Sequence, residues 1–302
     1  MLPVYYSDLF LEHLTGSNHF ERPARLTSIV AALKSASFAD RLEWRSPAEA
    51  SLDDIQRVHP LSYIQSVRDI AAAGGELDPD TPVSPRSYDA AKLAVGSWLD
   101  GVNAVMERGK PVFVLCRPPG HHAEPEQGMG FCVFANGSIA SLYALDRSDV
   151  GRVALFDWDV HHGNGSQAIL WDNPNTAYIS IHQAPLYPGT GKLEETGNHR
   201  NILNVPMAAG SGWTEYEAAM QTKILPFLKG FMPDLLLVSA GFDCGEDDPL
   251  AEMKLQPEAF GQMAQMCLEV TPRCLFGLEG GYRLENLANG WLSVAQTCMA
   301  YA

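Results

Sequence analysis

The sequence has no long apolar run and no basic segment at its start. No uninterrupted apolar stretch in its 302 residues approaches the roughly 18 residues that a membrane-spanning helix requires. The first residues, Met1 to Asp8, also lack the basic segment followed by an apolar core that marks a secretory signal. We therefore expect a soluble, cytoplasmic protein without a membrane partner.

Cysteine is scarce and unpatterned. The six cysteines show no Cys-x-x-Cys spacing, and several lie in apolar stretches, where a free cysteine behaves as a small hydrophobic residue. Neither a disulfide framework nor a zinc site built from thiolates is expected.

Basic residues are outnumbered by acidic ones. Lys and Arg total 21 against 36 Asp and Glu, which gives a formal net charge of −15. Such a charge opposes direct binding to nucleic acid and creates a long-range field that favours cationic substrates. The alternative is that the charge serves solubility alone, and net charge by itself does not separate the two.

Apolar runs typical of buried strands alternate with stretches of helical periodicity. The chain has 46% hydrophobic residues and no internal repeat or low-complexity linker, so residues 1–302 are expected to form a single domain. This alternation predicts an α/β fold with a mostly parallel sheet and helices on both faces. Strands are expected at Val112–Cys116, Val153–Phe156, Thr176–Ile181, Leu235–Ala240 and Cys274–Leu278. Helices are expected at Leu26–Ser37, Tyr63–Ala73, Tyr88–Glu107, Gly137–Leu145, Ser166–Trp171, Thr214–Leu228, Glu258–Val270 and Leu284–Met299.

The chain turns polar directly after the predicted strand Val153–Phe156. The next nine residues are Asp157-Trp158-Asp159-Val160-His161-His162-Gly163-Asn164-Gly165. The two-residue period of extended chain points Asp157, Asp159 and His161 the same way. Carboxylate oxygens and an imidazole nitrogen together suit a divalent metal such as zinc. The alternative is an ordinary polar turn after a strand.

Three other predicted strands end in similar chemistry, at the edge where parallel sheets bind ligands. The strand Val112–Cys116 is followed by Arg117-Pro118-Pro119-Gly120-His121-His122, and paired histidines are natural general acids and bases unless they are surface residues of a loop. After Leu235–Ala240, Asp243 offers a further carboxylate for a metal. After Cys274–Leu278 come Glu279-Gly280-Gly281-Tyr282, where the tyrosine either packs or donates to a developing oxyanion.

Together these motifs resemble the zinc-dependent histone deacetylase and acetylpolyamine amidohydrolase superfamily, in order from Glu21 to Tyr282. Asn164 and His122-Ala123-Glu124 look like the class II deacetylases and their bacterial relatives. The resemblance implies an arginase/deacetylase-like fold. The motifs are Glu21-Arg22-Pro23-Ala24-Arg25-Leu26, Arg117-Pro118-Pro119-Gly120-His121-His122, Gly130-Phe131-Cys132, Asp157 to Gly165, Tyr187-Pro188-Gly189-Thr190-Gly191, Ser239-Ala240-Gly241-Phe242-Asp243 and Glu279-Gly280-Gly281-Tyr282.

Residue by residue, the resemblance implies one catalytic zinc ion bound by Asp159, His161 and Asp243. It implies His122 as general base, His121 as a charge-stabilising partner that helps protonation, and Tyr282 as the oxyanion donor. Asp157 would contact His121, and Asn164 would contact His122. Because Asn is neutral and stabilises an imidazolium less than Asp does, His122 is expected to stay neutral and act as the base.

The resemblance also implies a narrow channel for an acylated amine, with aromatic walls at Phe131 and Tyr187 beside Gly130. Asp80 is a candidate for holding the substrate at the rim. A structural potassium ion is implied at Asp157, Asp159, His161, Ser180 and Ile181. We interpret His19, His59, His182 and His199 as structural or solvent-exposed.

We therefore expect a zinc-dependent amidohydrolase, a deacetylase that hydrolyses the acyl amide of acetyl-lysine or a related acylated amine. An acetylpolyamine deacetylase is the nearest alternative. A non-catalytic zinc-containing protein that binds acylated amines is the alternative from another class. An arginase-like enzyme with two metals is disfavoured because Cys244-Gly245 follows Asp243, so the second carboxylate of an Asp-x-Asp pair is missing. The sequence does not indicate the oligomeric state.

Overall fold

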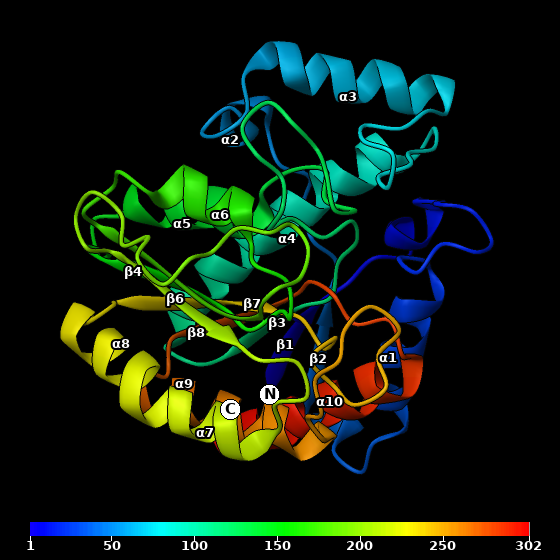
Figure 1. The fold of residues 1–302 in the computed structure, drawn as a ribbon. Helices are drawn as coiled ribbons and strands as arrows, with labels where there is room; N and C mark the ends of the chain where they lie inside the picture. Colours follow the sequence, from blue (N-terminus) through cyan, green and yellow to red (C-terminus); the bar gives the residue numbers. More distant parts are fainter. Residues whose placement is uncertain (302) are drawn as a thin grey trace.

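A single eight-stranded sheet runs through the computed structural model, which describes residues 1–301 (Figure 1). Its strand order is β2-β1-β3-β8-β7-β4-β5-β6, and every neighbouring pair is parallel. The strands are β1 Leu2–Tyr5, β2 Leu42–Arg45, β3 Val112–Val114, β4 Val153–Asp157, β5 Thr176–Gln183, β6 Ile202–Met207, β7 Leu235–Ala240 and β8 Cys274–Leu278.

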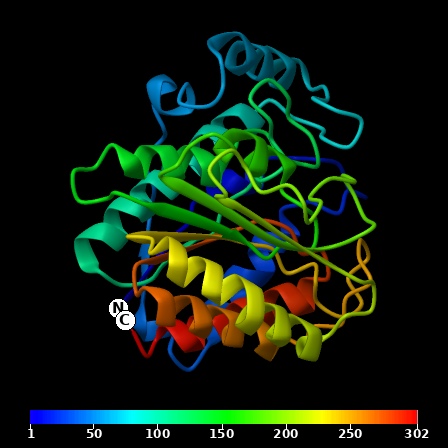
Figure 2. The same ribbon diagram turned by 60° about the vertical axis from the view of Figure 1, so that its left-hand side comes forward.

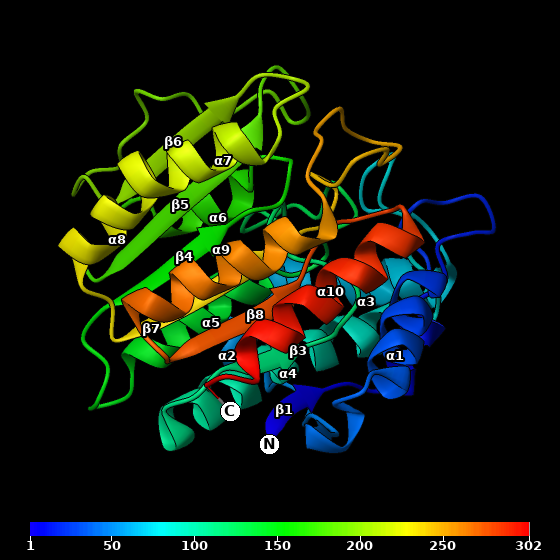
Figure 3. The same cartoon turned by 90° about the horizontal axis from the view of Figure 1, so that it is seen from below.

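Helices cover both faces of this sheet, as the alternation of strands and helices predicts. Helices α1 and α7 to α10 lie across one face (Figure 3). Helices α4, α5 and α6 lie on the other, and α2 and α3 stand outside α4 (Figures 1 and 2). The helices are α1 Ala24–Ser35, α2 Leu52–Ile55, α3 Leu61–Ala73, α4 Ser87–Arg108, α5 Asn136–Leu145, α6 Asn164–Leu170, α7 Trp213–Ala219, α8 Leu225–Phe231, α9 Pro257–Val270 and α10 Leu284–Cys298, with 3-10 turns η1 Asp8–Glu12 and η2 Ala39–Arg41. None of the helices in residues 1–301 has both the length and the apolar character needed to cross a bilayer.

The central strands are buried on both faces. Every residue of β4, β7 and β8 is buried between the two helical layers. A strand that is covered on both faces favours apolar side chains at nearly all positions, which explains why these strands appear in the sequence as long apolar runs with only Asp157 and Ser239 as polar exceptions. The five strands expected from the sequence are present, with boundaries that differ by at most two residues.

Strands β1, β2 and β6 were not expected from the sequence. Strands β1 and β2 have only four residues each, too few to show a clear period. Strand β6 lies at the edge of the sheet and contains Pro206, which interior strands do not tolerate because proline lacks an N–H donor. Pro206 therefore prevented the prediction of β6, although an edge strand tolerates proline.

The single helix expected at Thr214–Leu228 is wrong. The structure has α7 and α8 joined by the π-helical turn η3, Met220–Ile224. Pro226 stands in the first turn of α8, where its missing N–H cannot continue the hydrogen bonds of a regular α-helix. The wider π turn accommodates this break.

Candidate active site

The polar segments that follow β3, β4, β7 and β8 meet at one edge of the sheet. These four strands are consecutive in the sheet order and parallel, so their carboxyl ends are neighbours. Asp159, His161 and Asp243 each place a ligand atom within 4.8 Å of the others. His161 Nδ1 lies 3.1 Å from Asp159 Oδ1 and 3.1 Å from Asp243 Oδ2.

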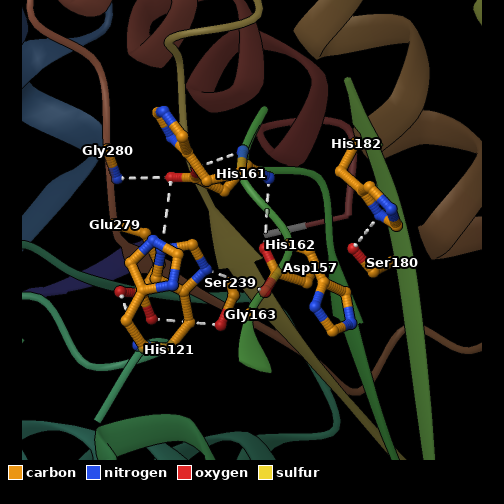
Figure 4. Close-up of polar contacts among 12 residues, drawn as sticks. His121, Asp157, His161, His162, Gly163, Ser180, His182, Ser239, Glu279 and Gly280 are labelled. Carbon is orange, nitrogen blue, oxygen red and sulfur yellow. Dashed lines mark hydrogen bonds and ion pairs between the residues drawn. The ribbon is translucent and has the colours of Figure 1, made fainter. Parts of the chain in front are cut away.

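Main-chain groups hold both carboxylates in this cluster. The N–H of Gly280 donates to Asp159 Oδ2 at 2.7 Å, as Figure 4 shows for the Gly280 nitrogen. The N–H of Val160 donates to Asp243 Oδ1 at 2.9 Å. A Cβ atom at position 280 would overlap the carboxylates of both Asp159 and Asp243. Glycine is therefore required here because the backbone itself forms the wall of the cluster.

The cluster concentrates charge in a buried place. Burial, together with the charge of Asp159, raises the pKa of Asp243 to about 7. Burial alone would lower the pKa of His161, but the hydrogen bonds to Asp159 and Asp243 outweigh it and raise the pKa to about 10. Carboxylate oxygens and imidazole nitrogens both bind zinc, and three protein ligands leave a position open, as a catalytic zinc site requires.

The first histidine of the tandem pair faces a carboxylate. Nδ1 of His121 lies 3.0 Å from Asp157 Oδ2, which also accepts the hydroxyl hydrogen of Tyr178 at 2.9 Å. Burial would lower the pKa of His121, but the charges of Asp157 and Asp159 outweigh it and raise the pKa to about 10. His121 is therefore an imidazolium at neutral pH, with its second N–H turned toward Asp159, 3.9 Å away.

The second histidine faces an amide instead. Nδ1 of His122 lies 2.8 Å from Asn164 Oδ1, and Asn164 Nδ2 donates to Glu124 Oε1 at 2.9 Å, which fixes the orientation of the amide. Since an amide oxygen only accepts, Nδ1 of His122 carries the hydrogen and Nε2 is left with a free lone pair. Burial and the charges of His121 and His161 hold the pKa of His122 well below its usual range.

Glu279 supports the tandem histidines from below, a role that sequence reasoning missed. Its buried carboxylate accepts the main-chain N–H of Gly120 at 2.8 Å and that of His121 at 3.3 Å, and the hydroxyl of Ser239 donates to it at 3.1 Å. Figure 4 shows His121 next to Glu279 and Ser239. Burial raises the pKa of Glu279 to about 7. The position of Glu279 directly after β8 was the sequence signal that could have indicated this role.

A cavity of about 200 Å³ opens above these groups. Leu186 and Leu250 also line it, and no local pattern in the sequence pointed to either. Tyr187 is 39% exposed, and its ring centroid lies 5.1 Å from that of His122. The cavity is lined by Asp80, His122, Gly130, Phe131, His161, Leu186, Tyr187, Leu250 and Tyr282.

Phe131, which forms an aromatic wall of the cavity, has an unusual backbone conformation that neighbouring residues hold in place. Phe131 has φ +68°, a left-handed value that a bulky residue seldom adopts. Asp80 Oδ1 accepts the N–H of Gly130 at 3.1 Å, and Thr81 Oγ1 accepts the N–H of Phe131 at 3.0 Å. Asp80 therefore binds the main chain of Gly130, next to Phe131, and helps to hold this wall of the cavity. Strain that is held in place in this way is typical of a functional site.

Tyr282 reaches the cavity from a loop that is fastened at two points. Asp248 accepts the N–H of Tyr282 at 2.7 Å. Arg25 donates to the main-chain oxygens of Glu279 and Gly281, and its guanidinium lies 5.0 Å from the centre of the Tyr282 ring. Burial raises the pKa of Tyr282, so the phenol keeps its proton and remains a donor.

The remaining predicted residues do not line the cavity. Asp157 pairs with Ser180 in the register of β4 and β5, beside Ile181, and a potassium ion there stays a prediction. His19 touches Phe131, with 4.7 Å between ring centroids, and His182 is buried and bonds Ser180 Oγ at 2.9 Å. His59 is buried too, whereas His199 lies on the surface near Asp172.

Comparison with known proteins identifies the family that the motifs indicated. The family model "Histone deacetylase domain" matches residues 19–298. The histone deacetylase-like amidohydrolase of Pseudomonas aeruginosa is 39% identical over 278 residues, which cover 88% of this chain and 73% of the relative. An uncharacterized protein of Synechocystis is 50% identical over 301 residues, 98% of each chain. The solved structure titled "Crystal Structure of HDA15 HD domain" matches with a TM-score of 0.95 and 34% identity, covering 100% of this chain and 89% of that one. The chain therefore belongs to the histone deacetylase family and, with it, to the hydrolases that act on amides.

Proposed function

We propose that this chain is a zinc-dependent deacetylase that hydrolyses the acyl amide of acetyl-lysine or a related acylated amine, with residues 1–302 as one catalytic domain. The observation that carries the proposal is the unequal pairing of the tandem histidines. His121 faces the carboxylate of Asp157, whereas His122 faces the amide of Asn164. Neighbouring groups whose pKa values are pushed apart in this way are typical of an acid and a base that share one reaction.

Asp159, His161 and Asp243 would hold the zinc ion. Their three donor atoms converge, their chemistry suits zinc, and Gly280 leaves room for the carboxylates. When bound, zinc supplies Lewis acidity toward the amide carbonyl and lowers the pKa of water.

The side chains around the cavity would transfer protons and stabilise the charge that develops during hydrolysis. Nε2 of His122 has the free lone pair needed to take a proton from water. His121, already protonated, would stabilise the negative charge that develops and help to protonate the leaving amine. The hydroxyl of Tyr282 would donate to the amide oxygen as that oxygen becomes an oxyanion.

The residues after Asp243 support one metal rather than the two of an arginase-like enzyme. Gly245 stands where the second carboxylate of an Asp-x-Asp pair would be, and the Sγ of the intervening Cys244 donates to the main-chain oxygen of Trp158 at 3.5 Å. Burial raises the pKa of this thiol well above its usual range, so it remains neutral and is a poor ligand for a cation.

The test is a substrate panel on zinc-loaded protein. It compares acetyl-lysine peptides, acetylated polyamines and longer acyl-lysines, and it measures released acid and free amine together. We expect equal amounts of both products from acetylated amines, and roughly a thousandfold slower release from His122→Ala. A chain that binds these compounds but releases no acid from any of them would instead be a non-catalytic binding protein.

A further inference from the structure

One histidine beside the cavity wall has both of its ring nitrogens on main-chain oxygens. Nδ1 of His19 lies 2.9 Å from the oxygen of Glu21, and its Nε2 lies 3.2 Å from the oxygen of Asp80. A main-chain oxygen can only accept a hydrogen bond. Both contacts are therefore hydrogen bonds only when both ring nitrogens carry a hydrogen, that is, when His19 is an imidazolium.

A neutral ring at this position cannot make the same two bonds. It carries one hydrogen, so one of the two oxygens would then face a nitrogen lone pair. Turning the ring over would place carbon atoms at both positions. His59 differs, because its ring accepts the N–H of Ala135 and donates to the oxygen of Pro125, which a neutral imidazole does. The number of bonds that His19 makes therefore depends on whether it is protonated.

The two bonds of His19 join two loops near the cavity. His19 lies in the irregular, mostly exposed segment between η1 and α1, and Asp80 lies in the loop between α3 and α4 and lines the cavity. The loop of Asp80 also accepts the N–H groups of Gly130 and Phe131, through Asp80 Oδ1 and Thr81 Oγ1. The ring of His19 packs edge-on against that of Phe131, with 4.7 Å between centroids. His19 therefore contacts both the aromatic wall and the loop that holds it.

The segments that contact His19 carry charged and titratable groups of both signs. These groups are His13, Glu21 and Arg22 on its own segment, Asp78 and Asp80 on the facing loop, and the thiol of Cys132 next to Phe131. Glu21 is already paired with Arg117, and Arg22 is exposed. Burial lowers the pKa of His13 and raises that of Cys132, so both stay neutral. In its charged form, His19 would therefore face a loop with two carboxylates, which attract it.

We propose that His19 is a positioning residue for the cavity wall, which ties the two loops together as an imidazolium and loosens the Phe131 wall when it loses a proton. An imidazole exchanges that proton between about pH 5 and 8. Both bonds form at the acidic end of this range and one is lost at the basic end, so the wall loosens as the pH rises. Phe131 needs such support because its φ of +68° is unfavourable for a bulky residue. The effect on substrate binding rests on the deacetylase function proposed above, whereas the joining of the loops does not.

Hydrogen exchange at the N–H groups of Gly130 and Phe131 tests the wall without any reaction. Protection from exchange, relative to an unfolded peptide, is compared at about pH 6 and about pH 8.5, on either side of the range in which an imidazole titrates. We expect roughly tenfold lower protection at the higher pH in the wild type, the ratio that about 1.4 kcal/mol produces, close to the value of one hydrogen bond to a charged group. His19→Gln has no proton to gain, so its protection should be low at both pH values. His199→Gln is the matched control, because His199 lies on the surface near Asp172, and it should behave as the wild type.

Steady-state kinetics show whether the wall matters to the substrate. The substrate is a single acetyl-lysine with both ends blocked, on the zinc-loaded enzyme. Between the same two pH values, KM should rise roughly fivefold more in the wild type than in His19→Gln, somewhat less than the tenfold that about 1.4 kcal/mol produces. The kcat of both proteins should follow one pH curve, because His19 contacts the wall and not the reacting groups. A merely structural role would alter stability and leave the pH dependence of KM as it is.

The possible failures are distinguishable. If exchange at Gly130 and Phe131 shows no dependence on pH that His19→Gln removes, the proposal is overturned. If KM follows the same pH curve in the wild type and in His19→Gln, His19 is overturned as a positioning residue for substrate binding. If no substrate is hydrolysed by any of the proteins, the deacetylase function falls, and the exchange measurement alone decides whether His19 holds the wall.

Discussion

Two buried charged clusters lie within this fold, and they are organised differently. Around Glu21, each charge has a partner. Arg117 grips the carboxylate with two donors, Arg25 adds a third at 3.2 Å, and the pKa of Glu21 is held well below its usual range because Arg117 outweighs the effect of burial. Around His161, two carboxylates converge on one imidazole beside an open cavity.

This difference distinguishes a cluster that stabilises the fold from a cluster that can bind a ligand. A closed cluster satisfies its own charges and has nothing left for a ligand. An open cluster keeps unbalanced groups at fixed positions, which is what a metal and a substrate require. Arg25 belongs to both, because it pairs with Glu21 and also donates to the loop that carries Tyr282. Substitutions in the two clusters should therefore have different effects.

Asp243→Ala should have the largest effect. It removes one of the three proposed metal ligands, so we expect less than one zinc ion per chain and a loss of acetate release of at least about ten-thousandfold. Metal analysis and the acetate assay measure this. As a control, zinc added back to chelated wild-type protein should restore activity, whereas excess zinc should not rescue the variant. A fully active, metal-free protein would contradict the assignment.

His122→Ala should come next. Removing the proposed base should lower kcat by roughly a thousandfold, within the usual range for general base catalysis. Zinc content should stay near that of the wild type, because His122 lies above the cluster and is not one of its donors. If zinc is lost together with activity, His122 is a metal ligand and the proposed division of roles is wrong.

Glu21→Gln breaks the closed cluster instead. Two buried guanidinium groups would lose their carboxylate, so we expect the free energy of unfolding to fall by about 3–5 kcal/mol. Denaturant titration measures the change. The kcat of the folded protein should fall far less than that of His122→Ala. A large loss of kcat without a loss of stability would show that the two clusters act as one.

Tyr282→Phe should have a smaller effect on catalysis than the loss of the base. It deletes one proposed oxyanion donor and keeps the ring, so kcat should fall by roughly a hundredfold while KM changes little. Steady-state kinetics with the best substrate measure both constants. Near-normal kcat would mean that the histidines and the metal stabilise the oxyanion without the phenol.

The smallest effect concerns a buried histidine outside both clusters. Burial lowers the pKa of His59 to about 4, and both ring nitrogens are hydrogen-bonded in the neutral form, to Pro125 O and to the Ala135 N–H. As the pH falls, the unfolded chain protonates His59 at a higher pH than the folded protein does. The free energy of unfolding therefore falls as the pH drops below about 6.5. We expect the contribution of His59 to the free energy of unfolding to be about 2 kcal/mol smaller at pH 5 than at pH 7. His59→Gln should flatten this part of the stability–pH curve, and an unchanged curve would contradict the shift.

Local sequence predicted the groups that the strands deliver directly. His121, Asp159, Asp243 and Tyr282 all follow predicted strands, and a parallel sheet brings such ends to one edge. The longer helices were located to within a few residues, except where Pro226 divides α7 from α8, whereas the four-residue helix α2 was not expected. Periodicity carries this information because it reflects burial on one face or on both.

Contacts between distant residues were beyond the reach of local patterns. Arg25 meets the oxygens of Glu279 and Gly281 across separations of 254 and 256 residues, and nothing near Arg25 in the chain signals that contact. Leu250 lines the cavity from an irregular loop that has no period to read. Such positions are set by tertiary packing.

The place of β8 in the sheet has a consequence for how the chain matures. Strand β8, Cys274–Leu278, lies between β3 and β7, so it alone joins β2-β1-β3 to β7-β4-β5-β6. Until β8 emerges from the ribosome, the nascent chain carries two partial sheets whose facing edges are unpaired and prone to aggregate. A chain that ends before residue 274 would therefore leave the two partial sheets unjoined, and it would also lack the loop that carries Tyr282.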